Sequence, residues 1–149
     1  MTRILFICHG NICRSTMAEF VMKDLVRKAG REKEFFIDSK ATSTEEIGNP
    51  PHPGTVRKMH QMNIKINEHR ASQMTKKDYD NFDLIIGMDS WNLKNILRII
   101  GQDTENKVHL LLDYTAHPRD IADPWYTHNF DETYNDVAEG CEALLASVH

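Results

Sequence analysis

The sequence has no hydrophobic stretch long enough to cross a membrane. The apolar run at residues 4–7 (Ile-Leu-Phe-Ile) has four residues, whereas a membrane-spanning helix needs about 20. The run is also shorter than the core of a secretory signal peptide, which takes roughly 7 to 15 residues. We therefore expect neither a membrane partner nor export.

Cysteine is scarce and odd in number, since the 149 residues include only Cys8, Cys13 and Cys141. Small secreted proteins that depend on disulfides carry more cysteines, usually in an even number. The sequence therefore favours a reducing cytoplasm, in which Cys8 remains a free thiol.

No long block of one charge is present either. The chain has 18 Lys and Arg against 22 Asp and Glu, a net charge of −4. A protein that neutralises a nucleic-acid backbone needs a basic face. We expect no nucleic-acid partner, and any phosphate chemistry must come from one local site.

Length and composition fit a single domain over residues 1–149, with 40% hydrophobic and 27% charged residues. Predicted strands alternate with predicted helices, which indicates an α/β fold whose parallel sheet is covered by helices on both faces.

Thr16 and Glu19 have the spacing of a capping box at the start of the first helix, and Gly30 supplies its end. Residues 42–54 are expected to form a loop beside a cleft, and residues 112–129 to be irregular. Strands are expected at 3–7, 35–39, 83–88 and 108–111, and helices at 16–29, 56–62, 91–100 and around Val137, Cys141, Leu144, Leu145 and Val148.

The loop after the first predicted strand carries the strongest chemical signal. Five residues separate Cys8 from Arg14, a spacing that lets a backbone curl around a tetrahedral oxyanion and return a guanidinium to its rim. The loop opens a helix at the carboxyl end of a strand, so its N–H groups favour negative charge there. Such a setting lowers a thiol pKa from about 8.5 to roughly 3.5–7.5. Cys8 is therefore a candidate nucleophile and the loop a candidate phosphate site.

The stretch Cys8-His-Gly-Asn-Ile-Cys-Arg-Ser15 resembles the phosphate-binding loop of the low-molecular-weight protein tyrosine phosphatases, C-L-G-N-I-C-R-S, at seven of eight positions. The larger tyrosine phosphatases place the acidic residue before this loop, whereas Asp123 follows it here. The resemblance implies a four-stranded parallel sheet flanked by helices in a three-layer sandwich. It extends to residues 38–39, 41–43, 47–51, 83–89, His69 and Asp123-Pro124.

The resemblance also implies a reaction and its main residues. Cys8 attacks phosphorus, Arg14 and the loop amides hold the phosphate oxygens, and Asp123 protonates the leaving phenolic oxygen before acting as base toward water. No metal and no cofactor are required. The phosphate-binding residues implied are Cys8, His9, Gly10, Asn11, Ile12, Cys13, Arg14 and Ser15.

Supporting roles follow from the same resemblance. Asn11 is expected to brace the loop through hydrogen bonds with Ser39 and His69, and the Ser15 hydroxyl to stabilise the Cys8 thiolate. Asn is also one of the few residues that tolerate left-handed geometry, which agrees with its place in the turn. The substrate cleft is expected to include His9, Ile12, Glu45 and Trp125.

Several residues keep a second interpretation. Cys13 either packs in the loop or traps oxidised Cys8 as a disulfide. His69 is alternatively a surface histidine and Trp125 a core residue. A zinc site of Cys8, His9 and Cys13 is disfavoured, because adjacent ligands without a second cluster make a poor tetrahedral set. Tyr126 is only a weak candidate for regulatory phosphorylation.

The chain departs from the family pattern at three positions. His9 replaces the usual Leu, Glu45 replaces a frequent aromatic residue, and Thr16 replaces Pro, a change that we expect to be harmless because Thr caps helices. His9 and Glu45 are expected to alter the pocket wall and the substrate preference.

Three other functions compete with phosphotyrosine hydrolysis. An arsenate reductase of this fold needs relay cysteines, which residues 82–89 lack. A phosphoarginine phosphatase characteristically has Thr at the position of Ile12. A phosphate binder or redox sensor needs no proton donor, whereas Asp123 is present. The expected partners are phosphotyrosine proteins and a cognate tyrosine kinase, and the sequence leaves the oligomeric state open.

Overall fold

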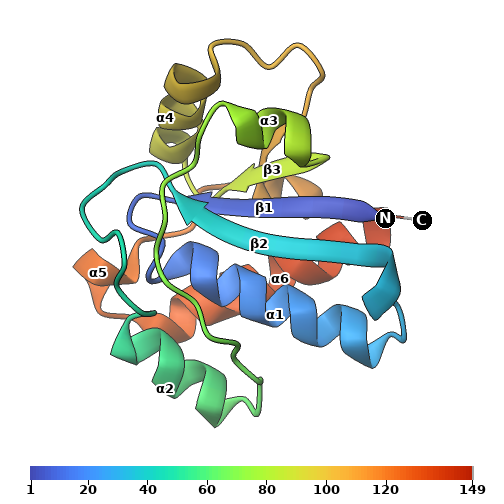
Figure 1. Ribbon diagram of the computed structural model, residues 1–149. Helices are drawn as coiled ribbons and strands as arrows, with labels where there is room; N and C mark the ends of the chain where they lie inside the picture. The colour runs from blue at the N-terminus through green and yellow to red at the C-terminus, as the bar shows by residue number, and fades with distance from the viewer. Residues whose placement is uncertain (149) are drawn as a thin grey trace.

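A four-stranded parallel sheet forms the centre of the protein (Figure 1). The computed structural model describes residues 1–148. The strands are β1 (Thr2–Cys8), β2 (Phe35–Ala41), β3 (Leu84–Gly87) and β4 (Val108–Leu110), in the order β2-β1-β3-β4. Every neighbouring pair runs parallel, so the carboxyl ends of all four strands lie at one edge. The predicted fold class is confirmed.

Helices cover both faces of the sheet. On one face lie α1 (Arg14–Lys28), α2 (Pro53–Gln61) and α6 (Phe130–Ser147), and on the other lie α3 (Lys77–Asn81) and α4 (Ser90–Ile100). The short α5 (Pro124–Thr127) lies near the carboxyl edge of the sheet. Two 3-10 helices, η1 (Glu32–Glu34) and η2 (Leu111–Tyr114), complete the described elements.

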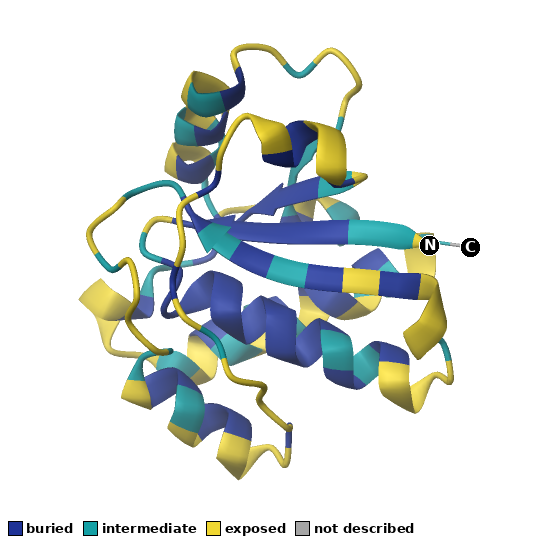
Figure 2. Ribbon diagram, viewed as in Figure 1, coloured by how far each residue is buried: buried dark blue, intermediate teal, exposed yellow. Residues whose placement is uncertain are grey.

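β1 separates two hydrophobic cores. Ile4 and Phe6 pack into the core beneath α1 and α6, whereas Leu5 and Ile7 pack into the core beneath α4. All four side chains have no exposed surface (Figure 2). Successive strand residues point to opposite faces, so a strand covered on both sides must be apolar throughout. This requirement explains the uninterrupted run that predicted the strand.

The predicted capping box at the start of α1 is wrong. The helix begins two residues earlier, at Arg14, and its N-cap Cys13 makes no side-chain capping bond. The Thr16 hydroxyl instead donates to the Cys13 carbonyl (2.9 Å), and the Glu19 carboxylate accepts from the Ser39 hydroxyl (2.6 Å). Thr16 therefore does not cap the helix. The spacing was right for a cap, but both side chains are drawn into buried contacts.

Other boundaries differ in smaller ways. α2 begins at Pro53, where the His52 ring accepts a hydrogen bond from the Gly54 N–H (2.9 Å). The segment expected to be irregular contains η2 and α5. α3 was not predicted, because its five residues are mostly polar and show no apolar period. On the closing helix Val137, Cys141 and Leu144 are buried as expected, Leu145 is half-buried, and Val148 lies beyond the helix end.

Among the described residues, we find no helix that combines the length and the apolar character needed to cross a membrane.

Gly140 tests how tightly α6 packs on η2. A Cβ added there would lie 2.5 Å from Leu111 Cγ. We expect Gly140→Ala to lower the free energy of unfolding by about 1–3 kcal/mol through overpacking, although helix propensity alone favours Ala by about 1 kcal/mol. Urea unfolding measures the change. The matched control, exposed Glu142→Ala on the same helix, should stay within about 0.5 kcal/mol, and a more stable Gly140→Ala variant would contradict the packing.

Candidate active site

Cys8 ends β1 and lies at the base of a pocket at the carboxyl edge of the sheet. Its side chain is buried, and the Sγ atom lies 3.0 Å from the Ser15 hydroxyl oxygen. The backbone N–H of Asn11 donates to the same Sγ at 3.3 Å. Hydrogen-bonding groups thus approach the sulfur from both the loop and the first turn of α1.

Asn11 holds the loop in a turn that most residues disfavour. Its φ is +59°, in the left-handed region, and the residue is fully buried. Its side-chain amide donates to the hydroxyls of Ser15 (2.8 Å) and Ser39 (2.9 Å), and its Oδ1 lies 2.8 Å from His69 Nε2. The two partners predicted for Asn11, Ser39 and His69, are therefore brought together with it, and Ser15, predicted to contact Cys8, is a third. They lie behind the loop rather than inside the pocket.

Glu19 completes this network, and sequence reasoning missed it. The Ser39 hydroxyl donates to Glu19 Oε1, which also lies 3.4 Å from His69 Nδ1. Lys23 donates to the other carboxylate oxygen at 2.6 Å. The only available signal was the capping-box spacing, which indicated a different role.

The neighbouring carboxyl group of Asp38 has a raised pKa. Burial raises the pKa of Asp38, the Ser39 N–H opposes this by donating to the carboxylate, and the charge of Glu19 raises it further. Among residues 1–148, Glu19, Asp38 and His69 form the one grouping of potential metal ligands. It excludes Cys8, His9 and Cys13, and its atoms are already engaged in the hydrogen bonds given above.

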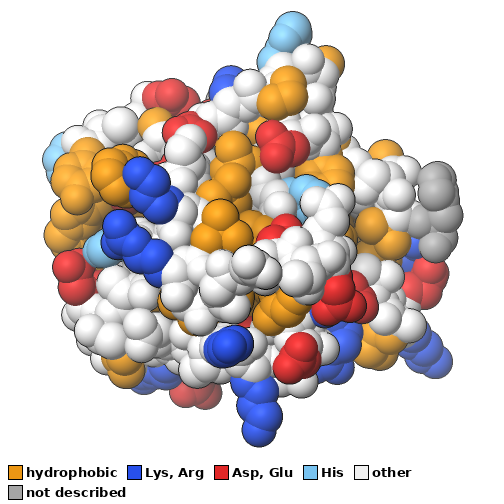
Figure 3. Space-filling view, turned by 90° about the horizontal axis from the view of Figure 1, so that it is seen from above, with side chains coloured by type: hydrophobic (Ala, Val, Ile, Leu, Met, Phe, Trp, Pro, Cys, Tyr) orange, Lys and Arg blue, Asp and Glu red, His pale blue; other side chains and the backbone are white. Residues whose placement is uncertain are grey.

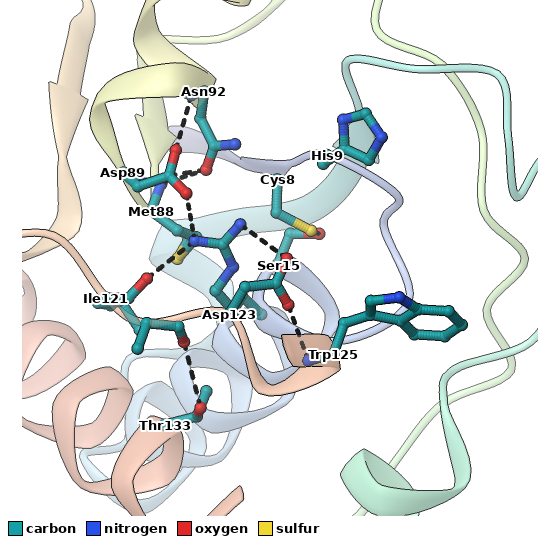
Figure 4. A network of polar contacts seen from close by, with 12 residues as sticks. Cys8, His9, Ser15, Met88, Asp89, Asn92, Ile121, Asp123, Trp125 and Thr133 are labelled. Carbon is teal, nitrogen blue, oxygen red and sulfur yellow. Dashed lines mark hydrogen bonds and ion pairs between the residues drawn. The ribbon is translucent and has the colours of Figure 1, made fainter. Parts of the chain in front are cut away.

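Arg14 is a buried cation held between the carboxylates of Asp89 and Asp123, both of which are labelled in Figure 4. Its guanidinium donates to Asp89 (2.6 Å), to the Ile121 carbonyl (2.8 Å) and to Asp123 (3.3 Å). Burial lowers the pKa of Arg14, but the charges of Cys8, Asp123 and Asp89 outweigh it and raise the pKa. The guanidinium is therefore charged and fixed in direction.

Asp89 is a site residue that the sequence analysis did not name. It follows β3 and forms the N-cap of α4, where it accepts from the Asn92 N–H (2.8 Å) while its other oxygen faces Arg14. Asn92 returns a capping-box bond by accepting from the Asp89 N–H (3.2 Å). The signal was an Asp directly after an apolar strand, at the edge where ligands of such folds bind.

Asp123 caps the short helix α5. Its Oδ1 accepts from the Trp125 N–H (3.0 Å), and Oδ2 faces Arg14. Pro124 occupies the first turn, where a missing N–H is harmless. The carboxyl side chain is 23% exposed and lines the pocket opposite Cys8. An acidic group therefore lines the same pocket as Cys8 while remaining open to solvent.

The pocket has a volume of about 110 Å³. It brings together residues from the Cys8 loop, the loop after β2 and the start of α5. Glu46 and Tyr126 line it although neither was predicted to. The lining residues are Cys8, His9, Gly10, Ile12, Cys13, Glu45, Glu46, Asp123, Trp125 and Tyr126.

The four predicted cleft residues all line this pocket. The His9 ring lies 2.9 Å from the Glu45 carboxylate, and both side chains are exposed on the rim. Trp125 is 51% exposed, so it is not a core residue, and its ring meets the His52 ring edge-on at 5.9 Å. Ile12 is buried and adds an apolar side chain to the same lining.

The two other cysteines lie in different surroundings. Burial, followed by the negative charges of Cys8 and Asp123, raises the pKa of Cys13 to about 12, although Cys13 lines the same pocket as Cys8. Its thiol is therefore protonated near neutral pH. Cys141 lies in the core beneath α1 and α6, where burial raises its pKa.

Comparison with known proteins agrees with this geometry. The family description "Low molecular weight phosphotyrosine protein phosphatase" matches residues 3–149. The protein tyrosine phosphatase YfkJ of Bacillus subtilis is 40% identical over 150 residues, covering 99% of this chain and 96% of that protein. A phosphatase of Gallus gallus is 40% identical over 151 residues, covering 98% and 95% of the two chains.

Solved structures give the same result. The crystal structure of YfkJ superimposes with a TM-score of 0.95, covering 99% of this chain and 94% of that chain. DARP, a Drosophila arginine phosphatase, is 29% identical with a TM-score of 0.88, covering 98% and 96% of the two chains. A full-length match, shared architecture and the loop around Cys8 lead to one conclusion: the chain belongs to the low molecular weight phosphotyrosine protein phosphatase family.

Proposed function

We propose that this chain is a cysteine-dependent protein tyrosine phosphatase that hydrolyses phosphotyrosine and small aryl phosphates. The observation that carries the proposal is that Cys8 and Asp123 line one pocket, while Arg14 lies behind it and donates a hydrogen bond to Asp123 at 3.3 Å. These groups supply a nucleophile, a cation for phosphate oxygens and a proton donor. None of these three roles needs a metal ion or a cofactor.

Two hydrogen-bonding groups contact the Cys8 sulfur. Asn11 donates to both serine hydroxyls, so each serine must send its own proton elsewhere. The Ser39 proton goes to Glu19, and the Ser15 proton is left to point at Cys8 Sγ, 3.0 Å away. The Ser15 hydroxyl and the Asn11 N–H therefore both direct a hydrogen at the sulfur that attacks phosphorus.

The uncapped start of α1 suits a phosphate group. No side chain occupies its first N–H groups, which leaves them for oxygen atoms of a ligand. A phosphate placed there also reaches Arg14. Its negative charge would replace Asp123 at the guanidinium, which frees this carboxyl group to act as an acid.

The reaction then proceeds in two balanced steps. Cys8 Sγ forms a bond to phosphorus as the bond from phosphorus to the phenolic oxygen breaks, and Asp123 gives that oxygen a proton. A water molecule next attacks the phosphocysteine, Asp123 takes its proton, and the sulfur leaves as thiolate. One carboxyl group thus serves both steps.

The pocket wall favours an aryl substrate over the alternatives. Ile12 and Trp125 present apolar surface beside Cys8, which suits a phenyl ring. A phosphoarginine substrate stays a competing prediction, since DARP is named an arginine phosphatase. An arsenate reductase relay is disfavoured because Cys141 is buried in the core. We further propose a cytoplasmic location, phosphotyrosine proteins as substrates and a tyrosine kinase as functional partner.

Substitution of the nucleophile tests the mechanism. With chelator present, the parent should hydrolyse para-nitrophenyl phosphate and phosphotyrosine faster than phosphoarginine, and Cys8→Ser should show no turnover above background. Steady-state rates of purified, reduced protein measure this. A folded parent without turnover, or a metal requirement, would rule the proposal out, and faster phosphoarginine hydrolysis would favour the alternative substrate.

The acid role of Asp123 is tested with two leaving groups. Asn keeps the helix cap but cannot donate the proton, so Asp123→Asn should lower kcat for phenyl phosphate roughly 10²-fold or more. The loss should be smaller for para-nitrophenyl phosphate, whose leaving group needs less protonation. Equal losses for both substrates would show that Asp123 does not act as the acid.

Asp89 is expected to hold the Arg14 guanidinium in the orientation that binds phosphate. Asp89→Asn keeps the N-cap of α4 but removes the charge that faces Arg14. A charge-assisted bond is worth about 1.5–3 kcal/mol, so kcat/KM and the affinity for inorganic phosphate should both fall roughly 10- to 100-fold. Asp120→Asn, an exposed carboxylate bonded to Ser90, is the control and should leave both values near those of the parent.

Cys13 is tested by oxidation. If it traps a Cys8 sulfenic acid as a disulfide, releasing water, then peroxide-treated parent should regain activity with dithiothreitol. Cys13→Ser should lose activity irreversibly under the same treatment. Equal recovery of both proteins would assign Cys13 to loop packing alone.

A further inference from the structure

A second pocket adjoins the candidate active site. It has a volume of about 340 Å³ and shares His9, Asp123 and Tyr126 with the pocket above Cys8. Trp91 and Asn95 of α4 form its outer wall. A residue next to a phosphotyrosine bound at Cys8 therefore has room to enter it.

The exposed face of α4 beside this pocket is aromatic and basic. Trp91 is 67% exposed, and Lys94 Nζ lies 4.8 Å from the centre of its ring. One turn further, Arg98 is exposed and its guanidinium contacts the Asn95 side chain at 3.3 Å. Asn95, Arg98 and His9 also line a smaller hollow between α4 and the end of β2. Figure 3 shows basic side chains beside hydrophobic ones over α4.

The charges on this face have no acidic neighbour on the same exposed surface of the helix. α4 contains two basic residues and no Asp or Glu, in a chain with a net charge of −4. Asp89 before it is engaged with Arg14, and Asp120 nearby accepts from the Ser90 hydroxyl at the other end of the helix. Within residues 1–148, neither Lys94 nor Arg98 forms an ion pair with a carboxylate. The face therefore complements negative charge.

The opposite wall of the site has the opposite charge. Glu45 and Glu46 lie in the loop after β2 and line the pocket above Cys8. β2 and β3 flank β1 on opposite sides, so Glu45 and Glu46 extend from one neighbour of β1 and α4 from the other, although the first residues of the loop, Thr42 and Ser43, also reach α4. A peptide lying across the pocket thus meets carboxylates on one side and cations on the other.

We propose that the α4 face, formed by Trp91, Lys94 and Arg98, binds acidic side chains adjacent to the phosphotyrosine of a protein substrate. Negative charge on one side of the phosphotyrosine is favoured by α4, whereas on the other side it is repelled by Glu45 and Glu46. The cleft therefore binds an acidic peptide with its chain in one of the two possible orientations. This inference rests on the proposed phosphatase activity.

Three phosphotyrosine peptides test the proposal. One carries two Asp residues before the phosphotyrosine, one carries them after it, and one has Asn at all four positions. For the parent at low salt, one Asp peptide should have a kcat/KM about fivefold above the other, mainly through KM, given that exposed pairs contribute about 0.2–1 kcal/mol each. The preference should shrink as salt rises.

Charge reversal locates the effect on α4. Lys94→Glu/Arg98→Glu should abolish or invert the preference, while the Asn peptide and para-nitrophenyl phosphate, which is too small to reach α4, should change less than about twofold. The matched control is Lys33→Glu/Lys65→Glu, two exposed lysines near the start of β2 at the far end of the sheet. It should keep the parent preference.

The outcomes separate this proposal from the activity on which it rests. Equal rates for the two Asp peptides, or equal changes in the α4 and control variants, would overturn the docking role while leaving the phosphatase function intact. Absence of para-nitrophenyl phosphate hydrolysis in the parent would overturn both.

Trp91→Ala gives a second measurement. KM for the preferred peptide should rise severalfold, whereas kcat for that peptide and the rate with para-nitrophenyl phosphate should not change. An unchanged KM would show that Trp91 does not take part in binding.

Discussion

The loop between β1 and α1 must point its backbone N–H groups at one spot beside Cys8, and the remaining architecture depends on this constraint. The turn requires left-handed geometry at Asn11, which costs free energy unless surrounding contacts hold it. The contacts come from α1 through Ser15, from β2 through Ser39, and from the segment carrying His69. Because every member of this buried network has a partner, loosening one leaves the others unsatisfied at high cost. The pocket is therefore shaped before any ligand arrives.

Charge imposes the second constraint. A buried guanidinium is costly unless opposite charges surround it, and Arg14 obtains them from the end of β3 and the start of α5 through Asp89 and Asp123. The same bonds place Asp123, the proposed acid, next to Arg14, the proposed phosphate-binding cation. Binding of a phosphate dianion would compete for that guanidinium, so ligand binding and release of the Asp123 carboxyl group are coupled through one cation. Two distant segments of the chain are thus tied to the first twenty residues by electrostatics rather than by sequence proximity.

The sequence predicts those features that depend on local pattern. Strands buried on both faces need continuous apolar runs, and the loop around Cys8 combines a turn residue with a helix start, so the fold class and the position of the loop were predictable. Hydrogen bonds and ion pairs between residues distant in the sequence were not predictable. Asp89 lies 75 positions from Arg14, and its place after an apolar strand marks it as a candidate site residue without indicating which residue it contacts. Glu19 fitted a helix cap by spacing, but a buried serine on β2 competes for its carboxylate. The short helices α3 and α5 depend on tertiary contacts and on one cap, which carry little periodic signal.

The buried reacting residues and the exposed residues of the pocket rim differ in how well they tolerate substitution. Cys8, Arg14 and Asn11 are buried and bonded on several sides, so substitution there disturbs both packing and chemistry. His9 and Glu45 are exposed and bonded mainly to each other, and an exposed pair of this kind contributes little to stability. A chain can therefore exchange an apolar rim for a charged one without weakening the pocket beneath it. On the proposed function, selectivity among phosphoproteins would then reside in exposed charge around a rigid centre, and a common loop would be compatible with different substrates.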